Sequence, residues 1–205
     1  TDAVATGERA LAMFDSVMGA DHPESYNSQS VLAGYRADAG AIAAADTDAR
    51  VAYEGLLQKM GARHDLTLAA GQRLALVELE TGRDRDAAMT LGAVLPVVRI
   101  KYGRVTAPYA VVLAVDASLR GSSGDSASAE SEFRGALSAL GGGTRMDSAA
   151  FPRIVVMYSA FLARHGQRAA GDALIRQALA FLPRTADRGA TVVADLQRAD
   201  IGRMR

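Results

Sequence analysis

Glycine recurs every 42 residues along this chain, and this period constrains the fold more than any other feature of the sequence. One series of glycines is Gly40, Gly82, Gly124 and Gly166, and a second series is Gly19, Gly61 and Gly103. Small residues follow the first series in phase, at Ala45, Ala87, Ala129 and Gly171, and again at Ala52, Val94, Ala136 and Ala178. Because a fixed period between about 20 and 50 residues is typical of repeat arrays, we interpret the chain as a repeat protein.

Each period predicts two helices joined by a glycine turn. Apolar residues recur at three- and four-residue intervals over residues 66–81, which is the pattern of an amphipathic helix. Residues 83–102 carry aspartates early and basic residues late, an order that suits the helix dipole. Glycine favours the junctions because it adopts a left-handed conformation without a β-carbon clash. The sequence therefore predicts an all-α fold with turns near residues 19, 40, 61, 82, 103, 124, 145 and 166.

These positions resemble the tetratricopeptide repeat. The family's Leu-Ala pair before the turn is matched by Leu32-Ala33 and Leu74-Ala75, and Pro183 lies where the family's second helix ends. The 42-residue period with a Gly-x-x-His turn is similar to the long form found in kinesin light chains and bacterial regulators. The resemblance implies a right-handed α-solenoid of antiparallel helix pairs. The third and fourth repeats depart from the pattern, with Asp116-Ala117 and Tyr158-Ser159 in place of Leu-Ala.

We expect a single helical-repeat domain over residues 1–205. It divides into a half repeat at 1–18, repeats at about 19–60, 61–102, 103–144 and 145–183, and a C-terminal capping helix at about 184–205. The chain begins in the middle of a repeat and without methionine, so we expect it to be a fragment of a longer protein.

Composition narrows the classes of function. The chain is 49% hydrophobic and 22% charged, as expected of a globular protein. Its longest apolar stretches reach about nine residues, short of the roughly 18 that span a bilayer, so no membrane insertion is expected. Zero net charge without a clustered basic face argues against nucleic acid. We expect a cytoplasmic location, with the periplasm as the alternative.

No residue pattern predicts catalysis, a metal or a cofactor. The chain lacks cysteine, a phosphate-binding loop and a nucleophile elbow. His22 and His64 occupy equivalent positions beside a glycine turn, where a polar residue opens a helix, and Asp21 with Glu24 resembles a capping box. His165 precedes Gly166 at a helix C-terminus, which favours a capping role there too.

Asp116 is the residue that departs most from its repeat, because Leu32, Leu74 and Tyr158 occupy the equivalent positions. A carboxylate at an interior position is costly unless it is paired. We expect a neighbouring arginine, Arg73 or Arg120, to satisfy it, or the helix to rotate and expose it. The alternative is a polar floor for a ligand.

The family resemblance places partner binding on a concave groove formed by the first helices. An asparagine that often clamps the partner's backbone in the family is replaced here by Val31, Arg73, Val115 and Met157. We predict that the partner-binding residues are Asn27, Tyr35, Arg73, Tyr109, Val112, Arg153 and Met157. Tyrosine and arginine anchors along an apolar strip are the composition of a binding hot spot, although half-buried core tyrosines would look the same.

The function that this sequence favours is a non-catalytic scaffold or sensor region that binds a protein or peptide partner, within a larger regulatory chain. The resemblance implies a bacterial source. Two alternatives stay open. The repeats could form the regulatory part of a larger enzyme, since similar bacterial repeats are joined to caspase-like proteases or serine/threonine kinases. They could also form a receptor for a small signal ligand.

Overall fold

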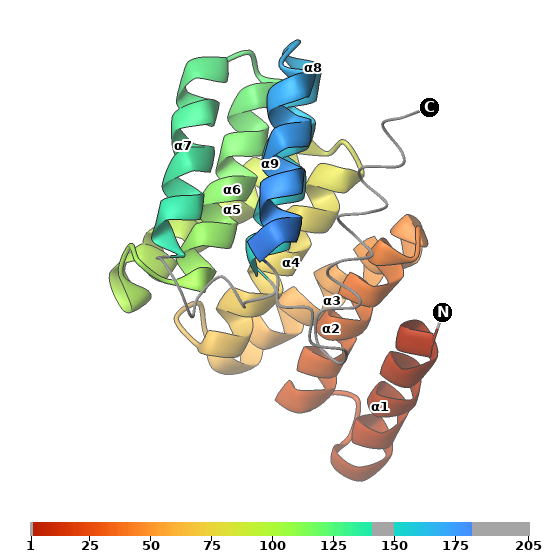
Figure 1. Cartoon of the computed structure of the whole chain (residues 1–205). Coiled ribbons are helices and arrows are strands. Elements are labelled where there is room, and N and C mark those ends of the chain that lie inside the picture. Colours follow the sequence, from red (N-terminus) through yellow and green to blue (C-terminus); the bar gives the residue numbers. More distant parts are fainter. Residues whose placement is uncertain (1, 141–149, 182–205) are drawn as a thin grey trace. The chain divides into compact units, whose positions relative to one another are not determined.

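A computed structural model describes residues 2–140 and 150–181 and divides the chain into two compact units, Thr1–Val98 and Arg99–Arg205. The helices that begin in unit 1 are α1 (Asp2–Met18), α2 (Pro23–Asp38), α3 (Ile42–Met60), α4 (Asp65–Glu80) and α5 (Asp84–Tyr102), whose last residues extend past the boundary. Those of unit 2 are α6 (Ala107–Ser122), α7 (Ser126–Ala139), α8 (Ala150–Arg164) and α9 (Arg168–Phe181). Over these described ranges every regular element is helical (Figure 1).

The predicted glycine turns are present wherever the structure describes them. All seven glycines of the two series have positive φ angles, between 71° and 93°. The predicted turn near residue 145, the stop at Pro183 and the capping helix at 184–205 lie outside the described residues. The sequence period therefore marks the points where the backbone needs a left-handed residue.

One backbone hydrogen bond recurs at the turns of the first glycine series. The residue after the glycine donates its N–H to the carbonyl oxygen four residues before the glycine, over 2.8 Å at Arg36, 2.9 Å at Glu78, 3.0 Å at Arg120 and 2.8 Å at Leu162. This is the bond of a Schellman motif, which satisfies a carbonyl that the helix end leaves free. The same turn geometry thus returns in each repeat.

Histidines open two of the first helices. Nδ1 of His22 accepts the N–H of Glu24 over 3.2 Å, and Nδ1 of His64 accepts the N–H of Leu66 over 3.3 Å. The capping role of the histidines is confirmed, but the Asp21 capping box is wrong. Asp21 instead accepts the Tyr26 hydroxyl over 2.6 Å and forms an ion pair with Lys59.

Small residues let the helices of each pair approach closely. Ala45, Ala87 and Ala129, at the repeat position five residues after the turn glycine, are completely buried. In unit 1 the core joins residues of α2, α3 and α4, namely Ala33, Ala45, Ala49, Leu74 and Val77. The predicted role of the repeated small residues as helix contacts is consistent with this burial.

The core of unit 2 contains an aromatic cluster among aliphatic side chains. Phe133 of α7 stacks on Tyr158 of α8 with ring centroids 5.0 Å apart, and Phe161 lies 5.3 Å from Phe133. Gly121 makes room for this cluster, because a β-carbon there would lie 2.7 Å from the ring of Phe161. The repeats share a backbone plan while their interiors are filled by different side chains.

In three repeats a polar side-chain contact links the first helix to the second helix. One residue of the contact lies at the end of the first helix, and its partner lies 12 residues later on the second helix. Arg36 pairs with Asp48, Glu78 accepts the hydroxyl of Thr90 over 2.8 Å, and Arg120 pairs with Glu132 over 2.9 Å. In the fourth repeat both positions are leucine, Leu162 and Leu174. We refer to these pairs as the hairpin clasps.

In unit 1 the first-helix residue of the clasp also forms an ion pair with the second helix of the preceding repeat. Glu8 pairs with Arg36 over 3.0 Å, and Arg50 pairs with Glu78 over 3.0 Å, so the two ion pairs have opposite polarity. Glu78 is only 1% exposed, and burial raises the pKa of its carboxyl group while Thr90 and Arg50 oppose the rise. Its charge is therefore tolerated only because both partners are present.

Replacing Gly82 by alanine should destabilise the protein by about 1–2 kcal/mol, because alanine clashes with its own backbone at this left-handed φ. The matched control is Gly92→Ala, inside α5, where a β-carbon would meet nothing within 4 Å. That variant should gain up to about 1 kcal/mol from helix propensity. Urea unfolding midpoints compare the two, and equal shifts of the same sign would contradict the turn assignment.

Arg50→Met should destabilise unit 1 by about 1–3 kcal/mol, because it leaves the buried carboxylate of Glu78 with only a neutral partner. The double variant Arg50→Met/Glu78→Met should recover most of this loss, since it removes the buried charge as well. Thermal unfolding of the two variants measures the difference. A double variant no more stable than the single one would contradict this account of the pair.

Candidate functional site

In unit 1 the predicted binding residues lie on two first helices that contact each other, α2 and α4. Tyr35 of α2 is 38% exposed, and Asn27 of α2 and Arg73 of α4 are half-buried. Nη1 of Arg73 donates to the buried hydroxyl of Ser30 over 3.1 Å, so this arginine also fastens α4 to α2. The sequence predicted its surface position but not this structural bond.

In unit 2 the other four predicted residues lie on α6 and α8, which also contact each other. Arg153 is exposed, and Tyr109 and Met157 are half-buried. Val112 is completely buried, so its side chain belongs to the core and offers no surface to a partner. Three of the four candidates therefore present atoms to solvent in this unit.

Asp116 is paired by an arginine, as the sequence analysis expected, and the partner is Arg120. Nε of Arg120 lies 3.1 Å from Oδ2 of Asp116 and 2.9 Å from Oε1 of Glu132, and the carboxylate of Asp125 lies 3.9 Å from Nη1. One guanidinium thus faces three carboxylates at the clasp between α6 and α7.

Burial and this surplus of negative charge together raise the pKa of Glu132. Burial raises the pKa of Glu132 to about 7, with the charge of Asp116 as the next cause, although Arg120 opposes the rise. Its Oε2 atom is buried and has no hydrogen-bond partner among the described residues. Near neutral pH this carboxyl group therefore exchanges a proton, and we interpret the cluster as a titrating clasp.

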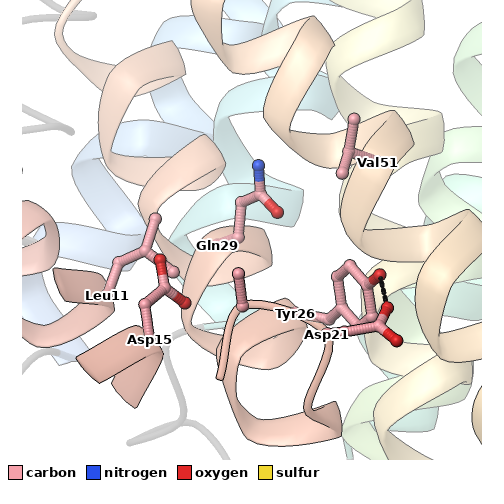
Figure 2. Close-up of a pocket in the computed structure, with 7 residues that line it drawn as sticks. Leu11, Asp15, Asp21, Tyr26, Gln29 and Val51 are labelled. Atoms are coloured by element: carbon pink, nitrogen blue, oxygen red, sulfur yellow. Dashed lines mark hydrogen bonds between the residues drawn. The ribbon is translucent and has the colours of Figure 1, made fainter. Parts of the chain in front are cut away.

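A pocket of about 360 Å³ opens in unit 1 between α1, α2 and α3 (Figure 2). Its walls come from the first turn and from three helices: Leu11, Asp15, Ala20, Asp21, Tyr26, Gln29 and Val51. It is lined by neither Asp116 nor Arg73, the residues for which a ligand-facing role was considered.

Packing and hydrogen bonds hold the polar side chains of this pocket. The ring of Tyr26 packs against Gly55, where a β-carbon would come within 2.4 Å of it, and its hydroxyl donates to Asp21 over 2.6 Å. Lys59 also bonds Asp21 and is the main cause that lowers the pKa of that carboxyl group. Oδ1 of Asp15 is buried without a hydrogen-bond partner among the described residues.

Sequence reasoning missed this pocket, although the repeat register carries a signal for it. The next repeat has Leu57 at the position of Asp15 and Arg63 at the position of Asp21. Two carboxylates therefore stand where the next repeat has an apolar and a basic residue, a departure as marked as that of Asp116.

The remaining candidate chemistry is structural. Nδ1 of His165 lies 2.9 Å from the carbonyl oxygen of Phe161, as expected of a histidine at a helix C-terminus. Among the described residues no group of three histidine, aspartate or glutamate side chains could hold a metal ion. No helix within residues 2–140 and 150–181 has the length and apolar character needed to cross a bilayer. The cytoplasmic location stays a prediction.

Comparisons with known proteins identify the fold. No family model and no curated protein matches the chain. Among solved structures it is similar to BtubC (BKLC) from P. vanneervenii, with a TM-score of 0.59 and 18% identity over 77% of this chain and 63% of that one. The chain thus spans less than two thirds of the length of BtubC.

A putative kinesin light chain from Podosopora anserina, with nearly identical TPR-like repeats, gives a TM-score of 0.59 and 18% identity over 87% of this chain and 85% of that one. A variant of it has the same score and identity, over 96% and 88% of the two chains. The predicted fold is therefore confirmed: it is all-α and belongs to the class of tetratricopeptide-like solenoids, as the likeness to kinesin light chain repeats indicated.

The stability of unit 2 should fall as pH rises from about 4.5 to about 7, because folded Glu132 keeps a proton over this range that the unfolded chain releases. Above about pH 7 its contribution should be constant. The charged groups facing it are Asp116 and Arg120 of α6 and Asp125 at the start of α7. Glu132→Gln should remove this part of the pH dependence, measured as unfolding midpoints from pH 5 to 8. A difference between variant and wild type that does not change with pH would refute the assignment.

Proposed function

We propose that this chain is a non-catalytic scaffold or sensor region that binds a protein or peptide partner through its first helices. We use the term first-helix surface for the outward faces of α2 and α4 in unit 1 and of α6 and α8 in unit 2. Its proposed contact residues are Asn27, Tyr35, Arg73, Tyr109, Arg153 and Met157. Val112 leaves this set because it is buried.

The observation that carries the proposal is the direct contact between successive first helices within each unit. Helices that stack side by side present equivalent faces to solvent, which makes a surface longer than one helix can offer. The residues on these faces are the types enriched at protein interfaces, namely tyrosine, arginine and methionine. This combination suits the recognition of an extended or helical segment.

The roles of the histidines support a non-catalytic function. All three histidines of the chain are engaged with backbone groups at helix ends: His22 and His64 accept N–H groups, and Nδ1 of His165 bonds a carbonyl oxygen. A general base must lie within hydrogen-bond reach of a proton that it removes from a substrate. Side chains occupied at helix termini suit that role poorly.

Arg73 also holds two helices together, in addition to its proposed role as a contact residue. Its bond to Ser30 joins two first helices, so Arg73→Ala removes a structural contact together with a surface cation. Tyr109 and Met157 lie on α6 and α8 as half-buried side chains. Their truncation gives the cleaner test of binding.

Peptides selected against the whole chain from a display library provide the ligand for the test. Tyr109→Ala and Met157→Ala should each weaken the selected peptide at least about tenfold, as expected of hot-spot side chains. The matched control is Arg134→Ala on the second helix α7, where the side chain is 70% exposed and forms an ion pair with Glu130 of its own helix. Isothermal calorimetry compares the affinities, with circular dichroism as a check on folding.

The reverse pattern decides against the proposal. Normal affinity in both α6 and α8 variants, combined with a loss in Arg134→Ala or in Arg99→Ala on α5, would move the binding surface to the second helices.

A further inference from the structure

We propose that the pocket between α1, α2 and α3 binds the guanidinium group of an arginine side chain presented by a protein partner. This inference does not rest on the first-helix surface, because the pocket is lined by α1, the first turn, α2 and α3 and includes none of the contact residues proposed above.

The lining of the pocket offers acceptors for a cation. Asp15 and Asp21 supply carboxylates, and Tyr26 supplies an aromatic ring (Figure 2). The Nε2 group of Gln29 donates to Oδ1 of Asp48 over 3.3 Å, which leaves the amide oxygen of Gln29 as an acceptor. No arginine, lysine or histidine is among the described residues that line it. An anionic ligand would therefore find no cationic partner among these lining residues.

Asp15 is the residue in greatest need of a partner. Its Oδ1 atom is enclosed by protein and has no hydrogen bond among the described residues, which is costly for a carboxylate oxygen. Rotation of the carboxylate would turn this oxygen toward the pocket. Asp21 is already matched, because Lys59 and Tyr26 both bond to it. The two carboxylates and one lysine leave a single negative charge, which one guanidinium would neutralise.

The acidic lining belongs to the first repeat unit and does not recur in the next one. At the positions of Asp15 and Asp21 the next repeat has Leu57 and Arg63, so it lacks the negative charge. At the positions of Leu11 and Gln29 it has Tyr53 and Gly71, and the ring of Tyr53 lies 2.7 Å from where a β-carbon on Gly71 would be. The ring therefore covers the glycine, in the place of a side chain such as that of Gln29.

Arginine fits this pocket better than other cations. Its planar fork donates to carboxylate and amide oxygens at fixed angles and stacks on aromatic rings, here that of Tyr26. The volume of about 360 Å³ is at the small end of ligand sites, which span about 300–1,000 Å³, so one side chain is a suitable occupant. The described residues contain no group with the three ligands that a metal ion needs.

The test uses the whole chain and the peptide acetyl-Gly-Arg-Gly-amide, followed by nuclear magnetic resonance. We expect saturable shifts of amide signals in residues 11–29 that weaken with added salt. The matched peptide carries citrulline in place of arginine, which keeps the shape and removes the charge, and it should bind at least about tenfold more weakly. Butylguanidinium should bind no more tightly than the arginine peptide. Tighter binding of this free cation would identify a small-molecule site and overturn the proposal.

Variants locate the binding in the pocket. Asp15→Asn, which keeps the side-chain shape, should weaken the arginine peptide about tenfold or more. Leu11→Tyr should abolish binding without changing the charge, because the larger ring takes up space beside Gln29 in the pocket. Glu54→Gln on the exposed face of α3 is the control and should bind as wild type.

Wild-type affinity in both Asp15→Asn and Leu11→Tyr would refute the site, as would equal affinity for the citrulline peptide. Circular dichroism of each variant shows that the helices are intact. Because no protein partner enters this experiment, its failure would leave the first-helix surface untouched.

Discussion

The structure depends on one hydrogen bond at a left-handed glycine. The N–H that follows the turn glycine bonds the carbonyl oxygen four residues before it, at Arg36, Glu78, Arg120 and Leu162. Glycine alone reaches this geometry without strain, so the helix must end and reverse there. Because three of these residues also supply the side chain of a hairpin clasp, the backbone turn and the register of the second helix are fixed at the same position.

The clasps show how a repeat can keep its geometry while its chemistry changes. Arg36 has one carboxylate on the second helix, whereas Glu78 has the hydroxyl of Thr90 there and takes its counter-charge from Arg50. At Arg120 the carboxylate of Glu132 on the second helix and that of Asp116 both contact the same guanidinium. The geometry tolerates all three arrangements. In the last one, burial and the nearby charge of Asp116 raise the pKa of Glu132 to about 7, from which the predicted pH dependence of this hairpin follows.

The two proposed binding sites have different relations to the repeat pattern. Where equivalent positions are stacked, as along α2 and α4 or along α6 and α8, the repeats add their surfaces together. Where one repeat departs from its neighbours, a local feature arises. The pocket at Asp15 and Asp21 is such a departure, since these two carboxylates stand where the next repeat has the apolar Leu57 and the basic Arg63. The geometry that the repeats share thus forms the extended surface, and residues that differ between repeats form the pocket.

The sequence by itself determined the helices, the turns and the small residues between paired helices, because these features depend on local backbone geometry and repeat with a period of 42 residues. It also placed most predicted binding residues on exposed or half-buried helix faces, though not Val112. Tertiary structure decided which polar side chains meet. The bond from Arg73 to Ser30 joins two helices, whereas Oδ1 of Asp15 has no hydrogen bond among the described residues. Both outcomes follow from tertiary packing, which no local sequence pattern encodes.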